Sequence, residues 1–358
     1  MRLLSPILQR VVYPAMGATG YFHARRHSSI SVITYHGVLP DGYRVIDPFL
    51  DNTLISTGAF RKQLRLLKEH YIIVSPEQFR SCLGNLNELP ERAVMLTCDD
   101  GLLNNLTVML PILQEERVPC LFFVTGSSTE NASPMLWYVE LYLIVVGAKA
   151  SRAPAQWKGM RVPVLPSDGV ARRTSWLQLT RALSNLPAQE RNEFLQEAAV
   201  WWGFQPAWKL KYQDDVMLRE RFQLLGPADL KELANAGMTI GAHTMSHPLL
   251  CAQEPELASD EILQCRERLE RVLGSSVWAM AYPFGDAASV GPREYRLAES
   301  AGFECAFLNV AGALSASRNF SLPRVHLSAE MSLPVYEAHI SGFHHALQAR
   351  FRGATSGG

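Results

Sequence analysis

The sequence predicts an α/β fold in which helices cover a parallel β-sheet that is either open or closed into a barrel. Short apolar runs recur along the chain without the polar and apolar alternation of a half-exposed strand, and segments with helical periodicity separate them. The composition also fits a globular protein, because 47% of the 358 residues are hydrophobic and 19% are charged.

The predicted strands and helices alternate in two parts of the chain. In the first part, strands are expected at 30–38, 72–75, 93–100 and 119–126, and helices at 58–71 and 104–118. After residue 226, helices are expected at 226–237, 255–274 and 292–302, and strands at 238–244, 277–285, 303–309 and 322–327. The body of the protein is expected at 29–345, followed by a flexible tail at 346–358.

The alternation stops between about residues 131 and 225, where we expect a helical insertion. Loops with proline and glycine join helical stretches there, such as 175–186 and 191–202. Six of the seven tryptophans fall in this region, namely Trp137, Trp157, Trp176, Trp201, Trp202 and Trp208. At helical spacing such side chains are mostly packing residues, with stacking on sugar rings as the alternative.

Residues 1–28 form a basic segment with an amphipathic pattern. The segment has no acidic residue, and its arginines are Arg2, Arg10, Arg25 and Arg26. One helical face would carry Leu4, Ile7, Leu8, Val11 and Val12. Gln9 and Arg10 interrupt the apolar stretch, so it lacks the core of a secretory signal and is too short to span a membrane. We expect it to pack on the body of the protein, with contact with an anionic membrane surface as the alternative.

Charge and cysteine usage restrict the partners and the location. The 34 basic residues balance the 34 acidic ones, which gives no electrostatic reason to expect a nucleic acid partner. The six cysteines show no Cys-x-x-Cys spacing, which favours a reducing compartment. We therefore expect a cytoplasmic protein, or one that lies peripherally at the inner face of the membrane.

Two adjacent carboxylates, Asp99 and Asp100, follow the predicted strand and precede Gly101. On its own this pattern is typical of a turn. At a strand end, however, neighbouring side chains point in different directions. One carboxylate could therefore bind a metal ion while the other faces a substrate.

A second motif favours the metal site over the turn. His243 and His247 lie four residues apart just after another predicted strand, and each can present a neutral imidazole nitrogen to one ion. Two histidines and one carboxylate make the three-ligand set of a catalytic zinc site, which leaves a position for water. We expect a divalent ion there, with zinc as the first choice, although other first-row ions also fit such a set.

The segments "TCDDG", "HTMSH" and "YPFG", each after a predicted strand, resemble the motifs of the polysaccharide deacetylases, metal-dependent amidases of the chitooligosaccharide deacetylase homology group. The resemblance covers residues 29–330 apart from the insertion, and "ITYHGV" is similar to the exopolysaccharide deacetylase branch. It implies an irregular (β/α)7 barrel with the helical insertion, and a carbohydrate substrate that carries N-acetyl amino sugars.

The resemblance also implies how the two central motifs would act. Asp99 would be the catalytic base, and the metal ligands would be Asp100, His243 and His247. A bound divalent ion would acidify its water and polarise the acetamide carbonyl, while the base takes the proton.

The remaining roles are expected of residues outside those two motifs. A backbone N–H near Tyr282, in the motif that contains Pro283, would stabilise the oxyanion. The leaving amine would receive its proton from His36, the first choice, or from His326, although a lone histidine can also be structural. The arginine that often precedes the proline of the third motif is absent, so Arg324 is the expected partner of the base.

The expected function is metal-dependent hydrolysis of N-acetyl groups from amino sugars of a polysaccharide or its precursor. A deacetylase or deformylase of a lipid-linked amino sugar is the alternative that the basic N-terminal segment slightly favours. A catalytically silent glycan-binding barrel is a further alternative, which the missing arginine and the Trp-rich insertion would fit.

Overall fold

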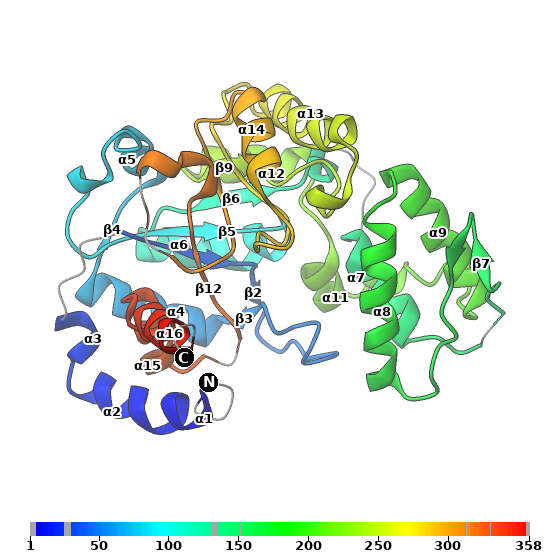
Figure 1. Ribbon diagram of the computed structural model, residues 1–358, viewed down its shortest axis with the longest axis horizontal. Helices are drawn as coiled ribbons and strands as arrows, with labels where there is room; N and C mark the ends of the chain where they lie inside the picture. The colour runs from blue at the N-terminus through cyan, green and yellow to red at the C-terminus, as the bar shows by residue number, and fades with distance from the viewer. Residues whose placement is uncertain are drawn as a thin grey trace.

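The computed structural model describes residues 5–24, 30–129, 135–150, 152–312, 314, 316–329 and 331–355, and its centre is a sheet of eight parallel strands (Figure 1). Seven of them follow one another in the order β11-β10-β9-β6-β5-β1-β12, and β4 pairs with β5 outside this path. The strands are β1 (Ser31–Tyr35), β4 (Ile72–Ile73), β5 (Ala93–Cys98), β6 (Leu121–Val124), β9 (Thr239–Ala242), β10 (Ala279–Ala281), β11 (Cys305–Phe307) and β12 (Val325–His326).

The chain between β11 and β12 closes this sheet. Leu322 forms a parallel bridge with Phe307 at the end of β11, and the N–H of Leu308 donates to the carbonyl of Leu322 at 2.8 Å. A few residues later, Val325 pairs with Ile33 of β1. The segment from Leu322 to β12 thus joins the two ends of the strand order, and the predicted irregular barrel is confirmed.

The strands bury both of their faces, which explains why their sequences do not alternate. In β5, Val94 and Leu96 belong to the apolar cluster shared with the outer helices, whereas Ala93 and Met95 belong to a second cluster with inward residues of the other strands. Cys98 follows the outward pattern and packs in the outer cluster. Because successive side chains of a strand point to opposite faces, one set fills the inside of the barrel and the other packs against the outer helices.

Helices cover the outside of the barrel between successive strands (Figure 1). They are α4 (Thr57–His70), α5 (Pro76–Ser81), α6 (Leu110–Glu116), α12 (Pro227–Asn235), α13 (Pro255–Leu273) and α14 (Pro292–Ser300). Capping side chains begin two of them, because Ser56 accepts from the Ala59 N–H and Ser75 forms a capping box. Gly274, with φ of 70°, ends α13 in the left-handed conformation that the sequence predicts for its glycine stop.

A helical lobe (residues 137–222) projects from one side of the barrel (Figure 1). It contains α7 (Trp137–Val146), α8 (Gly169–Leu183), α9 (Ala188–Trp201), α10 (Lys211–Asp214), α11 (Val216–Phe222) and the hairpin of β7 (Gln156–Trp157) and β8 (Met160–Arg161). An apolar cluster of its own includes all of Trp137, Trp157 and Trp202 as buried residues, with the other three tryptophans packed against it. The tryptophans of this region therefore act mainly in packing, although Trp176 also lines a cavity described below.

The N-terminal segment packs on the body of the protein through part of its apolar face. Its helices are α1 (Ser5–Ile7), a π-helical turn (Leu8–Val12), α2 (Tyr13–Ala18) and α3 (Tyr21–Ala24), and they pack against α15 (Leu333–Ile340). Tyr13 and Phe22 are fully buried there. Ile7 and Val11 instead remain 55% and 61% exposed. Arg2, Leu4, Arg25 and Arg26 lie outside the described residues.

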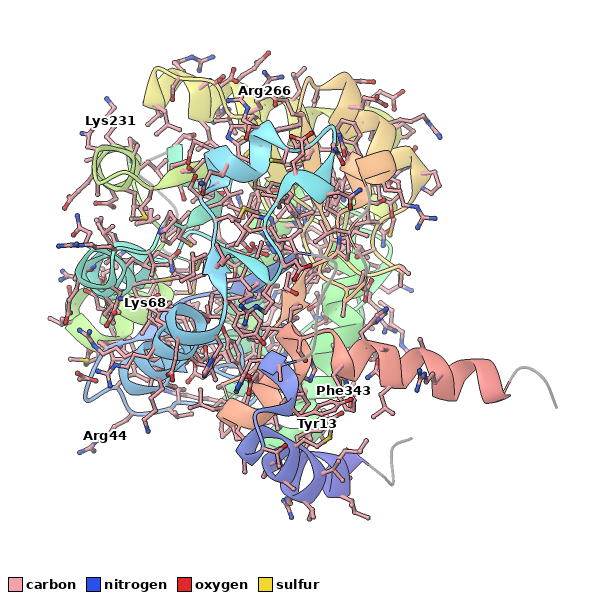
Figure 2. All side chains as sticks on the ribbon, turned by 90° about the vertical axis from the view of Figure 1, so that its left-hand side faces the viewer. Tyr13, Arg44, Lys68, Lys231, Arg266 and Phe343 are labelled. Atoms are coloured by element: carbon pink, nitrogen blue, oxygen red, sulfur yellow. The ribbon has the colours of Figure 1, made fainter. Side chains whose placement is uncertain are left out.

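The C-terminal region differs from the flexible tail expected at 346–358. A helix, α16 (Phe343–Thr355), runs through most of this range, and residues 356–358 lie outside the description. Figure 2 shows Phe343 beside Tyr13, and its ring centroid lies 5.5 Å from that of Phe22. This aromatic contact holds the first turn of α16, from which the helix continues. Among the described residues, no helix combines the length and apolar character needed to cross a membrane.

Candidate metal centre and active site

The two carboxylates leave β5 in different directions because the chain turns sharply between them. The N–H of Asp99 still donates to the carbonyl of Tyr35 in the sheet at 2.9 Å, whereas Asp100 has φ of 79° and Gly101 has φ of 73°. A Cβ at Gly101 would lie 3.0 Å from the side chain of Val124, so only glycine fits this turn without displacement. The motif is thus both a turn and a means of directing two acids to different partners.

Asp100, His243 and His247 converge, as the sequence predicts. The Asp100 Oδ1 atom lies 3.6 Å from Nε2 of His243 and 3.5 Å from Nε2 of His247, and all three side chains are buried. The Nδ1–H of His243 donates to the carbonyl of Ala281 at 2.7 Å, which leaves its Nε2 lone pair free to coordinate. These residues form the group of three possible metal ligands found among the residues that the structure describes.

The charges of this cluster favour a cation. Burial, together with the nearby charge of Asp99, raises the pKa of Asp100 to about 7. Burial also lowers the pKa of both His243 and His247, which keeps the imidazoles neutral. Among the described residues, Asp100 forms no ion pair with a lysine or arginine, and a divalent ion would supply the positive partner of this buried carboxylate.

Asp99 is held by Arg324, the partner that the sequence predicts for it. The guanidinium donates from Nη1 to Oδ1 and from Nη2 to Oδ2, both at 2.7 Å, and both residues are buried. Burial alone would raise the pKa of Asp99, but the charge and hydrogen bonds of Arg324 lower it to about 2. Arg324, the residue just before β12, therefore keeps this carboxylate charged and oriented in place of the arginine missing from the third motif.

His36 and His326 lie side by side near Asp99. Their ring centroids are 5.3 Å apart in an edge-to-face arrangement, so the structure brings both predicted candidates to the same site. Burial lowers the pKa of His36 to about 3, and its buried Nδ1 atom has no hydrogen-bond partner among the described residues. The Nδ1 atom of His326, in contrast, lies 3.3 Å from the side-chain amide of Asn309.

The sequence predicts an oxyanion donor near Tyr282, and the hydrogen bonds of the third motif restrict which N–H could serve. The N–H of Tyr282 donates to the carbonyl of Phe307 at 3.0 Å within the sheet, so it is not available to an oxyanion, and Pro283 has no N–H. The next residue, Phe284, has φ of 62°, and its ring centroid lies 5.1 Å from that of His247. Phe284 is the next residue of this motif that has an N–H, and its side chain contacts the predicted ligand His247.

The helical lobe reaches the metal centre through Tyr138, which the sequence analysis did not single out. The ring centroid of Tyr138 lies 5.0 Å from that of His247 and 6.0 Å from that of Phe284. Tyr138 also lines a cavity of about 220 Å³ that includes His36 and Asp100 in its walls. Its neighbour Trp137 belongs to the Trp-rich insertion. The aromatic composition of that insertion is the sequence signal that could have indicated the contact of Tyr138 with His247.

The lobe also supports the backbone of residues 243–247, the metal loop. The indole N–H of Trp137 donates to the carbonyl of His247 at 2.9 Å, and Arg191 places its guanidinium over the Trp137 ring while it donates to Ser246. Thr244 and His247 have φ of 62° and 55°, a conformation that costs non-glycine residues about 1–3 kcal/mol. Contacts from the lobe thus hold a strained loop in place.

Comparison with known proteins places this barrel and site in a family. The family model for polysaccharide deacetylase matches residues 86–161 and 193–306, more than half of the chain, and the chain belongs to this family. Over 104 residues it is 35% identical to the poly-beta-1,6-N-acetyl-D-glucosamine N-deacetylase of Escherichia coli K12. That match covers 28% of this chain and only 14% of the relative.

Solved structures share the fold at low sequence identity. The deacetylase PplD of Streptococcus pyogenes, in complex with acetate, is 19% identical and superimposes with a TM-score of 0.55 over 87% of this chain and 98% of that one. IcaB of Ammonifex degensii is 18% identical, with a TM-score of 0.52 over 88% of this chain and 98% of that one. These similarities concern the arrangement of the chain, and the resemblance of the barrel to deacetylase barrels agrees with the family assignment.

We predict that Trp137→Phe weakens metal binding, because it removes the hydrogen bond to His247 but keeps an aromatic ring. The affinity for Zn²⁺ or Co²⁺, measured by competition with a chromophoric chelator, should fall about 10-fold, as for other groups that orient metal ligands. Trp157→Phe is the matched control, since the indole N–H of Trp157 donates to Glu197 within the lobe and touches no metal ligand. Equal affinities of the two variants would show that the lobe does not support the metal loop.

Proposed function

We propose that this chain is a metal-dependent hydrolase that removes N-acetyl groups from amino sugars of a polysaccharide or its precursor. The observation that carries the proposal is the convergence of Asp100, His243 and His247 with a charged Asp99 beside them. The family assignment and the N-deacetylase activity named for the Escherichia coli relative support the same reaction. Zinc is the proposed ion, because it prefers such a mixed nitrogen and oxygen ligand set.

The arrangement of the side chains suits hydrolysis of an amide. A divalent ion held by the three ligands would supply Lewis-acid polarisation of the amide carbonyl and of the attacking water. Asp99 takes a proton from that water as its oxygen bonds to the carbonyl carbon, and Arg324 keeps the carboxylate charged and correctly oriented. The N–H of Phe284 is the proposed donor to the oxyanion. The C–N bond then breaks to give acetate and the free amine.

The amine nitrogen needs a proton as it leaves, and His36 is the proposed donor, a role in which its pKa must rise from about 3 as negative charge develops on the substrate beside it. Its Nδ1 atom has no protein partner among the described residues, and the ring lines the same cavity as Asp100. His326 lies next to it but already contacts Asn309. The base and the three ligands occur together, which disfavours a catalytically silent glycan-binding barrel.

The first test concerns the metal and the base. Chelation should abolish acetate release from N-acetylglucosamine oligomers, and Zn²⁺ should restore it. Asp99→Asn should keep bound metal, measured by elemental analysis, yet lower the rate about 10²- to 10⁴-fold, because proton removal from water is lost. Asp168→Asn, at the exposed start of α8, is the control and should keep full activity. A fully active Asp99→Asn protein would rule out this residue as the base.

A second test separates the two histidines. His36→Ala should lower the acetate-release rate about 10²-fold or more, since protonation of the leaving amine is lost. His326→Ala should retain most of the activity, because this ring is held by Asn309 outside the proposed proton path. The reverse ranking would assign the proton transfer to His326 instead.

We also propose peripheral contact with an anionic membrane surface through the N-terminal segment. Ile7 and Val11 are exposed beside Arg10, so an apolar and basic face remains after the segment packs on α15. The protein should sediment with vesicles that contain anionic phospholipid, and a double Ile7→Asp and Val11→Asp variant should not. Val164→Asp combined with Val200→Asp, at exposed positions of the lobe, is the control. Equal sedimentation of the two variants would contradict this contact.

A further inference from the structure

We propose that the cavity beside Asp100 binds the apolar aglycone of the substrate, so that the sugar is presented to the metal centre as a glycolipid. This inference rests on the proposed deacetylase function and names the substrate class. It concerns a site built from the helical lobe and from the β2–β3 loop, residues 40–54 between β2 (Val38–Leu39) and β3 (Ile55–Ser56).

The walls of the cavity are apolar where they leave the reaction site. His36 and Asp100 line it together with a larger set of hydrophobic side chains, which includes Phe49, Leu54, Leu102, Leu136, Val139 and Phe222. Five lining residues are aliphatic, and such side chains cannot stack on a sugar ring or pair with its hydroxyl groups; they are Leu50, Leu54, Leu102, Leu136 and Val139. The aromatic lining residues Phe49, Tyr138, Trp176 and Phe222 can contact either a sugar face or a hydrocarbon chain. A hydrocarbon chain, in contrast, gains free energy from every methylene group that it buries there.

The one cationic side chain of the cavity is already paired. Arg221 donates from Nε to Asp51 Oδ1 at 2.7 Å and from Nη2 to the carbonyl of Leu50 at 3.0 Å, and both ionic partners are buried. Its guanidinium is therefore engaged with the protein. Sugar hydroxyls placed against the aliphatic part of the lining would lose their hydrogen bonds to water without replacement, which is unfavourable.

Specific contacts between the lobe and the β2–β3 loop build this cavity. Asp47 of the loop accepts hydrogen bonds from Tyr142 and Arg173 of the lobe. The ring of Phe49 lies edge to face with that of Trp176, with 5.7 Å between centroids. Figure 1 shows the loop extending from the barrel toward α11. The cavity thus depends on elements that the barrel strands do not supply.

The same loop extends the apolar surface outward. Val45, Ile46 and Phe49 are 55%, 45% and 45% exposed, which places three large hydrophobic side chains on the outer part of a cavity-lining segment. An aglycone longer than the cavity would leave it over this loop. The combination of an apolar interior and an apolar exposed loop is expected for a lipid-linked substrate, whereas a polymer of sugars requires polar partners along its path.

The test compares the methyl and octyl glycosides of N-acetylglucosamine below the micellar concentration. With the metal-loaded protein, the octyl glycoside should have a KM at least about 10-fold lower at similar kcat, since each buried methylene contributes about fourfold. Phe49→Ser should reduce this KM ratio about fourfold or more. Leu177→Ser is the matched control, because Leu177 is also 45% exposed and lies on α8 outside the cavity lining. The KM of the methyl glycoside is divided by the KM of the octyl glycoside for the same variant, so a general loss of activity does not affect the comparison.

Each outcome decides between the inferences. Equal KM values for the two glycosides, or a lower KM for soluble N-acetylglucosamine oligomers than for the octyl glycoside, would overturn the aglycone site while the deacetylase function stands. Hydrolysis of the oligomers alone would likewise overturn the aglycone site while the deacetylase function stands. If neither the glycosides nor the oligomers are hydrolysed, the proposed function fails, and calorimetric binding of the octyl glycoside then tests the cavity by itself. Binding that Phe49→Ser weakens and Leu177→Ser does not would support the site, and equal binding to both variants would overturn it.

Discussion

The buried ion pair between Asp99 and Arg324 is the interaction on which the site and the closure of the barrel both depend. Arg324 lies within the segment that joins β11 to β1, and its guanidinium also donates to Thr97 of β5 and to the carbonyl of Leu308 after β11. One side chain therefore connects the chain just after β11 with β5, the strand that ends at the two acids. Removing one member of a buried pair costs about 3–5 kcal/mol, so catalysis and stability constrain the same two residues.

The ion pair also separates the roles of two adjacent carboxylates. The guanidinium keeps Asp99 ionised, whereas the sharp turn at Asp100 and Gly101 directs the second acid away from Arg324 and toward two neutral imidazoles. Because the pKa values of the two acids are displaced in opposite directions, to about 2 and about 7, their environments differ although they are neighbours in the chain. Such a separation is how one short motif can supply a base and a ligand.

The barrel and the central ligands were predictable because they depend on local patterns, whereas the corrections come from contacts that the sequence does not display. Buried strands and motifs at their ends indicated where Asp100, His243 and His247 would meet. The sheet register that engages the Tyr282 N–H with Phe307 has no local signal. The helix at the C-terminus likewise depends on Phe343 packing against the N-terminal segment, more than 300 residues earlier. Long-range pairing of this kind overrides local composition.

Part of the helical lobe lies outside the match to the family model. The family model leaves residues 162–192 unmatched, and this gap contains Arg191, which contacts the metal loop, and Trp176, which lines the apolar cavity. The loop that carries His247 has a strained backbone, and strain persists only where surrounding contacts overdetermine it. The lobe contacts the metal loop with some of its residues and lines the proposed substrate cavity with others. A change in the lobe is therefore expected to affect both metal binding and the shape of that cavity. Selection of a different substrate could therefore act on the lobe while the barrel and its acids stay unchanged.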